Sequence, residues 1–422
     1  MNISFYTLGC KLNQAETDEL KKGLEQLNFD IVPFGSSEDI AVIRACGVTC
    51  GASQTTREMI RRVKRNGAYV IVTGCLENHD LPEIDFVGEN NTTVVEHLTA
   101  LSLRRAELLC HCERKRSNLA GSKLTRLLRF ARNDSENSPG NNKSAKIRKF
   151  IKIQTGCNFQ CTYCIIPSFR GKSQSEPPDG IIKKIDLAVG NGCKEVILTG
   201  VNICQYKYEN LDLAGLLKQV LEKTKIRRIR LGSLDPRLIT GGLIKLYNNS
   251  ERLLPHWHLS LQSGSNSVLK RMARGHTVKH YQKITNQLRN DNPLFSFTTD
   301  IIVGFPDETQ EEFMQTYGFV KKTRFSKVHI FPFSPRPGTP ANRLKPVHNQ
   351  IVTDRVNKLT TICKKISKDY KKQFIEKIRN VLFENKTGAS WIGYTPEYFK
   401  IKFESDENLK NEIKKIKIEN QT

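Results

Sequence analysis

The first hundred residues alternate between short apolar runs and longer amphipathic stretches. The apolar runs cover residues 3–8, 40–43 and 69–72, and each ends near a Gly or a Cys. The stretches between them, at residues 14–27 and 53–65, have the spacing of helices. Short strands alternating with helices predict an α/β domain with a mostly parallel, open sheet.

A second alternation begins near Lys149. Helix-like stretches, for example 211–222 and 308–321, separate six strand-like runs at residues 150–154, 195–199, 226–231, 257–261, 297–303 and 328–333. Repeated βα units of this kind predict a barrel or partial barrel. A polar, Lys-rich helix follows Pro346, and short β-type runs at 381–383 and 398–403 predict a small C-terminal β-barrel.

These patterns predict five parts of the chain. Residues 102–143 fit neither alternation, because they are rich in Arg, Ser and Asn and end in a linker composition. Their Cys110-His111-Cys112 lacks the second half of a zinc site, so we expect these residues to bind no metal. The segment resembles translated repeat elements found inside some bacterial genes. The predicted parts are an α/β sheet domain (1–101), a basic inserted linker (102–143), a barrel (144–345), a connecting helix (346–378) and a small β domain (379–422).

The composition excludes several classes of protein. Hydrophobic residues make up 38% of the chain and charged residues 26%, as in globular proteins. No apolar run approaches the roughly 18 residues of a membrane span, and the N-terminus has no secretory pattern. We therefore expect a cytoplasmic protein without membrane association, whose twelve cysteines serve metals or catalysis rather than disulfides.

The charge balance points to a polyanionic partner. The net charge is +24, and residues 104–132 hold nine basic and two acidic residues, which leaves +17 for the rest of the chain. Nucleic acid is the commonest ligand of such a surface.

Three cysteines with the spacing C-x3-C-x2-C carry the most specific signal. Cys157, Cys161 and Cys164 follow directly on the first predicted barrel strand. Three thiolates in one loop can hold three corners of a 4Fe–4S cluster and leave the fourth iron open to S-adenosylmethionine (SAM). The alternative is a zinc loop or three unliganded thiols, but a structural zinc site needs four ligands.

The segment 156–167, followed by Arg170-Gly171, resembles the core motif of the radical SAM superfamily, and more closely that of its methylthiotransferase branch. The resemblance covers nearly the whole chain apart from residues 102–143. It implies a partial (β/α)6 barrel in which Cys157, Cys161 and Cys164 hold the catalytic cluster at the carboxyl ends of the strands.

A second set of cysteines lies at the ends of the three N-terminal strands. Because carboxyl ends of parallel strands share one edge, Cys10, Cys46 and Cys75 could converge there, although three buried structural cysteines are equally compatible with these positions. The segments 9–13, 46–49 and 73–75 match the branch, which implies that these cysteines bind an auxiliary 4Fe–4S cluster. In one departure, Arg44-Ala45 stands where the family usually has Asn-Thr.

The resemblance also implies SAM contacts at the ends of three barrel strands. Segment 198–202 would hold the amino group, segment 260–265 the ribose and carboxylate, and segment 300–306 the adenine. The residues assigned to the cofactor are Gly200, Asn202, Gln262, Ser263 and Gly304. Taken singly, each of these residues could equally be part of an ordinary strand followed by a turn.

Residues 379–422 resemble a TRAM domain, which binds RNA in this family. The motifs at 8–14, 198–203 and 329–336 are most similar to the subgroup that acts on N6-threonylcarbamoyladenosine in tRNA. The resemblance implies that two SAM molecules, two clusters and an unidentified reductant convert a C–H bond next to the anticodon into C–S–CH3. We expect the protein to be a monomer. Alternatives are a methylthiotransferase for isopentenyladenosine or a ribosomal protein, a non-catalytic RNA-binding iron–sulfur protein, and a zinc-dependent nucleic-acid protein.

Overall fold

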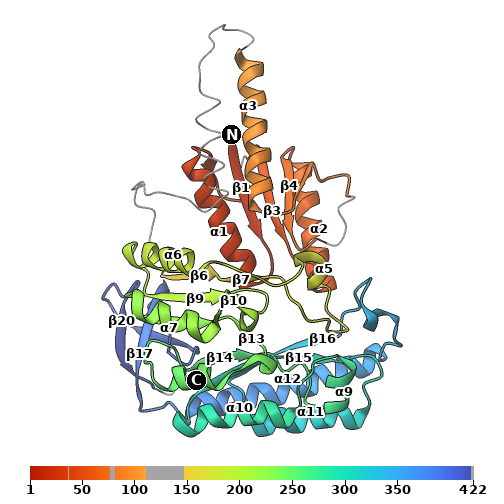
Figure 1. Cartoon of the computed structure of the whole chain (residues 1–422), viewed down its shortest axis with the longest axis vertical. Helices are drawn as coiled ribbons and strands as arrows, with labels where there is room; N and C mark the ends of the chain where they lie inside the picture. The colour runs from red at the N-terminus through yellow and green to blue at the C-terminus, as the bar shows by residue number, and fades with distance from the viewer. Residues whose placement is uncertain (37, 77–80, 111–146, 420–422) are drawn as a thin grey trace. The chain divides into compact units, whose positions relative to one another are not determined.

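The chain forms two compact units. In the computed structural model, residues 1–36, 38–76, 81–110 and 147–419 are described (Figure 1). One unit comprises Met1–Lys143 together with Ser168–Arg170, and the other comprises Ser144–Pro167 and Gly171–Thr422. The two units are described separately below.

The first unit is built on a parallel sheet of five strands in the order β2-β1-β3-β4-β5. The strands are β1 (Asn2–Thr7), β2 (Asp30–Ile31), β3 (Ile40–Ala45), β4 (Tyr69–Gly74) and β5 (Phe86–Gly88). The helices are α1 (Lys11–Gln26), α2 (Cys50–Arg65) and α3 (Asn91–Cys110). The predicted open α/β sheet is confirmed.

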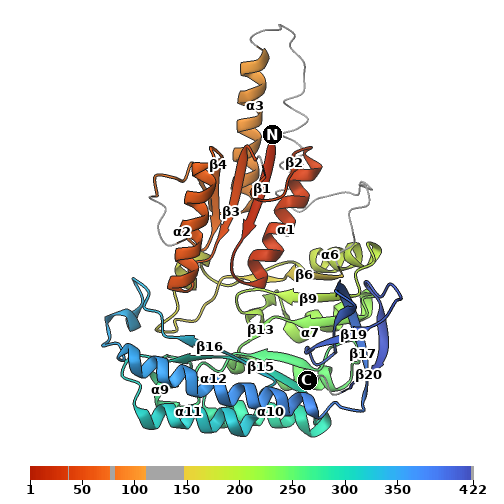
Figure 2. The same cartoon turned by 180° about the vertical axis from the view of Figure 1, so that it is seen from behind.

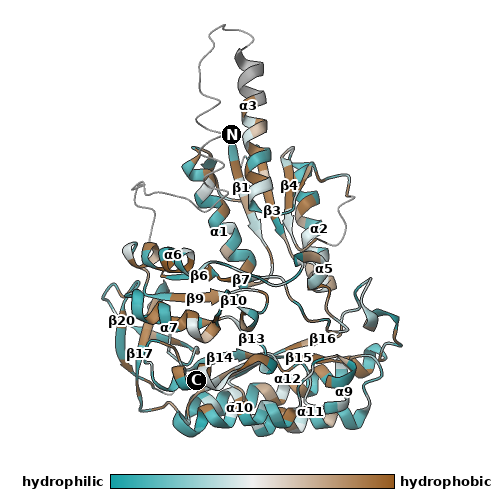
Figure 3. Ribbon diagram, viewed as in Figure 1, coloured by the Kyte–Doolittle hydropathy of each residue, from teal (hydrophilic) through white to brown (hydrophobic). Residues whose placement is uncertain are grey.

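Alternating apolar residues of this sheet form two cores, one on each face. Ile3 and Val42 pack with Leu20 of α1 and Leu98 of α3. On the other face, Ile43, Val70 and Val72 pack with Ile60 and Val63 of α2. Strands β3 and β4 carry long hydrophobic stretches (Figure 3). Because side chains of a strand alternate between faces, burying both faces requires nearly continuous apolar runs, as β3 and β4 show.

Helix α3 differs from the sequence-based prediction. It continues to Cys110, so residues 102–110 are helical although we predict a linker from residue 102. Leu, Ala, Arg and Glu predominate there without Gly or Pro, and these residues favour helix extension. The remainder of the predicted insertion, including His111 and Cys112, lies outside the described residues.

We predict that deletion of residues 111–142 leaves the fold and iron content of the protein intact. The free energy of closing a loop changes only slowly with loop length, so a shorter connection costs little. The thermal midpoint and the iron bound per chain, measured on anaerobically purified protein, should match those of the full chain. Insoluble or iron-free protein would show that the segment is structural.

The second unit contains parallel strands that form a partial barrel. Its sheets have the orders β12-β9-β6 and β13-β14-β15-β16, and only Gly232 separates β12 from β13. The strands are β6 (Arg148–Lys152), β9 (Glu195–Thr199), β12 (Arg228–Leu231), β13 (Ser233–Leu234), β14 (His256–Leu259), β15 (Ser296–Val303) and β16 (Lys327–Pro332). The predicted fold class is therefore confirmed.

Helices cover the outside of these strands, and α10, α11 and α12 lie along the sheet that contains β14, β15 and β16 (Figures 1 and 2). The main helices are α6 (Pro178–Gly190), α7 (Leu213–Lys223), α8 (Gly241–Asn248), α9 (Asn266–Arg271), α10 (Val278–Asp291), α11 (Gln310–Thr323) and α12 (Asn349–Lys372). Their apolar faces form one core with the strands, in which Trp257, Tyr281 and Phe297 are fully buried. Within the described residues, no helix is both long and apolar enough to cross a membrane.

An antiparallel half-barrel follows α12. Its strands, in the order β19-β18-β17-β20, are β17 (Ile378–Thr387), β18 (Ser390–Tyr394), β19 (Lys400–Glu404) and β20 (Ile413–Lys417). Phe383, Trp391 and Ile401 pack against Tyr370 and Phe374, at the end of α12 and just beyond it. This sheet corresponds to the predicted C-terminal β structure.

A buried ionic cluster connects this half-barrel to the parallel strands. Glu195 of β9 is inaccessible to solvent and accepts hydrogen bonds from Arg228 Nε at 2.8 Å and Arg230 Nε at 3.1 Å. Burial alone would raise the pKa of Glu195, but the two guanidinium groups hold it at about 2. Arg228 also donates to the carbonyl oxygens of Asn380 and Thr395. Through these hydrogen bonds, Arg228 links Glu195 of the barrel strands to the backbone of the half-barrel.

Candidate functional site

The loop that carries Cys157, Cys161 and Cys164 begins with a close backbone approach. Gly156, which follows β7 (Gln154–Thr155), has a φ of +71°, and a Cβ at this position would lie 2.0 Å from the Lys172 carbonyl oxygen. Only glycine fits there. The backbone N–H of Cys157 donates to the Gly171 carbonyl oxygen at 3.0 Å, which closes the loop.

Two other segments hold the middle of this loop. The Thr162 hydroxyl donates to the Arg271 carbonyl oxygen at 2.9 Å. The backbone N–H of Thr162 donates to the Met272 carbonyl oxygen at 3.2 Å. Ala341 N–H donates to the Thr162 carbonyl oxygen at 2.9 Å. The segment just after the motif at 329–336 thus contributes to fixing the cysteine loop.

Cationic and amide donors are directed at the sulfur atoms of the loop. Arg237 and Arg274 approach Cys161 Sγ at 3.9 Å and 3.7 Å, and Gln205 approaches Cys157 Sγ at 3.7 Å. Asp235 binds both arginines, at 2.6 Å and 3.3 Å. Weak N–H···S contacts from charged groups suit thiolates that hold an anionic cluster. Sequence reasoning missed these residues, although Asp235 follows the end of a barrel strand.

The thiols of the loop are partly shielded from solvent. Burial raises the pKa of Cys164 to about 11, so in the metal-free protein this thiol is protonated at neutral pH and metal binding releases its proton. Within the described part of the chain, no three His, Cys, Asp or Glu side chains are arranged to hold a single metal ion. In a 4Fe–4S cluster each thiolate binds a different iron.

Of the predicted SAM contacts, Asn202 has a side-chain atom that suits a ligand, whereas Gly200 is required by packing. A Cβ on Gly200 would lie 2.6 Å from the Gln154 carbonyl oxygen, so the chain passes closely here. Asn202 is buried, and its N–H donates to Gln154 Oε1 at 2.9 Å. Its Oδ1 atom is buried and has no hydrogen-bond donor among the described residues. This orphaned acceptor fits an ammonium group.

The other predicted contacts have partners within the fold. The Ser263 hydroxyl is 3.1 Å from the Thr316 hydroxyl of α11, and the N–H of Gly304 donates to Glu308 Oε2 at 2.9 Å. Gln262 has a φ of +75° and pairs through its backbone with β15. Ser263 and Gly304 therefore have structural contacts in addition to any contact with a cofactor.

Cys10, Cys46 and Cys75 converge at one edge of the N-terminal sheet, as their positions in the sequence predict. Cys10 is the N-cap residue of α1, Cys46 follows β3 and Cys75 follows β4. A Cβ on Gly9, whose φ is +89°, would lie 2.7 Å from Cys46 Sγ. The N–H of Cys75 donates to the Ala45 carbonyl oxygen at 3.2 Å.

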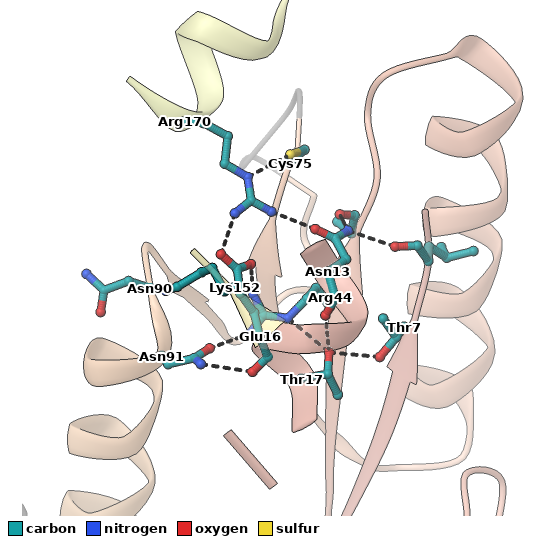
Figure 4. A network of polar contacts seen from close by, with 12 residues as sticks. Thr7, Asn13, Glu16, Thr17, Arg44, Cys75, Asn90, Asn91, Lys152 and Arg170 are labelled. Atoms are coloured by element: carbon teal, nitrogen blue, oxygen red, sulfur yellow. Dashed lines mark hydrogen bonds and ion pairs between the residues drawn. The ribbon is translucent and has the colours of Figure 1, made fainter. Parts of the chain in front are cut away.

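A polar network includes Cys75 (Figure 4). Arg170, at the end of α5 (Ile166–Arg170), belongs to the first unit by its packing. Its Nε donates to Cys75 Sγ at 3.3 Å, Nη1 to Glu16 Oε1 at 2.7 Å and Nη2 to Asn13 Oδ1 at 2.6 Å. Burial raises the pKa of the Cys75 thiol, and Arg170 opposes that shift.

The departure at Arg44 belongs to the same network. Its Nη1 donates to Glu16 Oε2 at 2.9 Å and its Nε to Thr17 Oγ1 at 3.0 Å. The guanidinium is buried and paired, so the substitution of the family's usual Asn is accommodated at the cysteine site.

Comparison with known proteins agrees with this geometry. Residues 151–320 match the model of the radical SAM superfamily, and residues 2–95 match that of uncharacterized protein family UPF0004. Threonylcarbamoyladenosine tRNA methylthiotransferase MtaB of Bacillus subtilis is 32% identical over 99% of this chain and 93% of its own length. The chain belongs to the radical SAM methylthiotransferase family. The protein of the same name from Aquifex aeolicus is 36% identical over 89% of this chain and 90% of its own.

A solved structure supports the fold. The match to the structure of the radical SAM methyltransferase TsrM from Kitasatospora setae covers 81% of this chain and 76% of that chain. The TM-score is 0.51 and the sequence identity is 11%. As a member of this family, the protein is an enzyme that transfers sulfur-containing groups and uses a 4Fe–4S cluster and SAM.

Proposed function

We propose that the protein converts N6-threonylcarbamoyladenosine next to the anticodon of tRNA into its 2-methylthio derivative. In this proposal Cys157, Cys161 and Cys164 hold the cluster that binds SAM. Cys10, Cys46 and Cys75 hold a second 4Fe–4S cluster. Two SAM molecules are consumed, one as methyl donor and one as radical source, and a C–H bond of the base becomes C–S–CH3.

The convergence of Cys10, Cys46 and Cys75 is the observation that carries the proposal. Radical generation requires only the cysteine loop of the barrel, so a second set of thiols indicates a separate task. The buried Arg170 directs an N–H at Cys75 Sγ, as suits an anionic ligand. A sulfur-carrying cluster at this edge accounts for both features.

The choice of nucleoside rests on the relatives. Three of those named as threonylcarbamoyladenosine tRNA methylthiotransferases are 32–36% identical to this chain, from Bacillus subtilis, Aquifex aeolicus and Thermotoga maritima. Two named as tRNA-2-methylthio-N(6)-dimethylallyladenosine synthases, from Wolbachia and Natranaerobius thermophilus, are 28% and 30% identical. The charge of +17 outside residues 104–132 further favours RNA over a protein substrate.

The residues of this chain have separable tasks in the proposed reaction. When bound, the barrel cluster supplies the electron that cleaves the C–S bond of SAM, and the second cluster supplies the transferred sulfur. Arg237 and Arg274, oriented by Asp235, stabilise the Cys161 thiolate, and Asn202 Oδ1 accepts a hydrogen bond from the SAM ammonium group. Exposed Lys386 and Lys400 of the half-barrel contact RNA phosphates. Trp391 and Phe399 are buried in the half-barrel core, so their rings do not stack on RNA bases.

A substrate comparison tests the proposal. Anaerobically reconstituted protein with reductant and SAM would be given separately tRNA that carries threonylcarbamoyladenosine, tRNA that carries isopentenyladenosine, and ribosomal protein. Mass spectrometry should find the methylthio group on the first tRNA alone. Modification of either other substrate instead would overturn the assignment.

We predict that Asn202→Ala weakens SAM binding by about tenfold or more, because a hydrogen bond to a charged group contributes about 1.5–3 kcal/mol. The dissociation constant of SAM would be measured on reconstituted protein. Asn357→Ala, at an exposed position of α12, is the matched control. Unchanged affinity in folded Asn202→Ala protein would remove Asn202 from the site.

A further inference from the structure

We propose that Arg170 is a positioning residue of the second cluster. Its Nε–H donates to the sulfur of Cys75 and raises the cluster's reduction potential, and the Glu16–Arg44 pair orients its guanidinium group. This inference rests on the proposed function, because it requires a cluster on Cys10, Cys46 and Cys75.

The geometry around Arg170 leaves its guanidinium little freedom. All three of its nitrogen atoms have a partner in the first unit, namely Cys75 Sγ, Glu16 Oε1 and Asn13 Oδ1 (Figure 4). The Arg170 side chain is only 10% exposed. Asn13 is itself fixed, because its Nδ2 donates to the carbonyl oxygens of Leu8 at 2.7 Å and Ala45 at 3.0 Å. The planar guanidinium therefore presents Nε to the sulfur in a defined direction.

The network places positive charge next to Cys75. Glu16 is shared by two buried arginines, Arg170 through Oε1 and Arg44 through Oε2. The electrostatic partners of Arg170 are Glu16 and Cys75, whereas Arg44 also interacts with Glu19. Arg170 therefore directs both an N–H and a positive charge at Cys75.

Arg44 has a distinct task in this arrangement. Its side chain is 4% exposed, and it binds Glu16, Thr17 and Asn91. Asn91 returns a hydrogen bond to the Glu16 carbonyl oxygen at 2.9 Å. Arg44 thus holds Oε2 of the Glu16 carboxylate, and this fixes the position of Oε1, which binds Arg170.

A cluster becomes more negative when it is reduced. Nearby positive charge and N–H···S hydrogen bonds stabilise the reduced form more than the oxidised form, and so raise the potential. The effect is strong here because the groups are shielded from water. Removing Arg170 should therefore lower the potential, whereas removing the charge of Glu16 should raise it.

The test measures the midpoint potential of the second cluster by redox titration monitored by electron paramagnetic resonance. The full-length chain with Cys157, Cys161 and Cys164 replaced by Ala serves as background, so that only this cluster is observed. Arg170→Met, Arg170→Lys and Glu16→Gln are compared with Arg57→Met, which alters an exposed arginine of α2.

We expect the potential to fall in Arg170→Met, to fall less in Arg170→Lys, and to rise in Glu16→Gln. A merely structural role would not move the potential in opposite directions. If Arg170→Met does not fold or does not retain iron, the shifts in Arg170→Lys and Glu16→Gln decide. Potentials equal to that of Arg57→Met, or shifts of one sign in all variants, would overturn the inference. An Arg57→Met protein that folds but binds no cluster would instead overturn the proposed function.

Discussion

Replacement of Cys157, Cys161 and Cys164 together by Ala is expected to remove about half of the iron and to abolish cleavage of SAM. Each set of three cysteines holds one 4Fe–4S cluster, so loss of one set leaves the other. Without the barrel cluster there is no electron donor for the C–S bond of SAM. Iron per chain and 5′-deoxyadenosine formation after reduction would be measured on anaerobically purified protein.

A matched control is the double variant Cys193→Ala and Cys363→Ala. Both cysteines are buried among apolar residues of the second unit. Their replacement should leave iron and SAM cleavage close to those of the parent protein. Unchanged iron in the triple variant would contradict the assignment of Cys157, Cys161 and Cys164 as cluster ligands.

Replacement of Cys10, Cys46 and Cys75 by Ala is expected to separate radical formation from sulfur transfer. These cysteines lie in the first unit, whereas the barrel cysteines and Asn202 lie in the second. The variant should therefore still form 5′-deoxyadenosine when reduced, and should add no methylthio group to tRNA. Both products would be quantified in the same reaction by mass spectrometry.

Two outcomes would contradict this division of tasks. Methylthiolated adenosine made by the variant would show that the sulfur does not come from a cluster on Cys10, Cys46 and Cys75. Absence of 5′-deoxyadenosine from a variant whose barrel cluster is spectroscopically intact would show that the two cysteine sets cannot be assigned separate tasks.

The parallel strands could be predicted because their apolar runs are nearly continuous, as in Glu195–Thr199 and Ile40–Ala45. Strands with other patterns were missed. In β20, lysines interrupt the apolar positions of Ile413–Lys417, and β2 and β5 are too short to produce a pattern. Edge strands tolerate such sequences because only part of each is buried.

Placement of Cys10, Cys46 and Cys75 followed from the sequence because each cysteine comes shortly after a strand of the same parallel sheet. The contact of Arg170 with Cys75 could not be predicted in this way. It joins residues 95 positions apart in the chain and depends on packing of Ser168–Arg170 within the first unit. The same is true of Arg237 and Arg274 at Cys161, which no local pattern marks.

Nucleoside analysis of tRNA tests the central claim most directly. Total tRNA from cells with and without an intact gene for this protein would be digested and compared by mass spectrometry. We predict that 2-methylthio-N6-threonylcarbamoyladenosine is absent without the gene, that N6-threonylcarbamoyladenosine accumulates, and that the gene restores the methylthio derivative. Unchanged 2-methylthio-N6-threonylcarbamoyladenosine, with loss of the methylthio derivative of isopentenyladenosine instead, would contradict it.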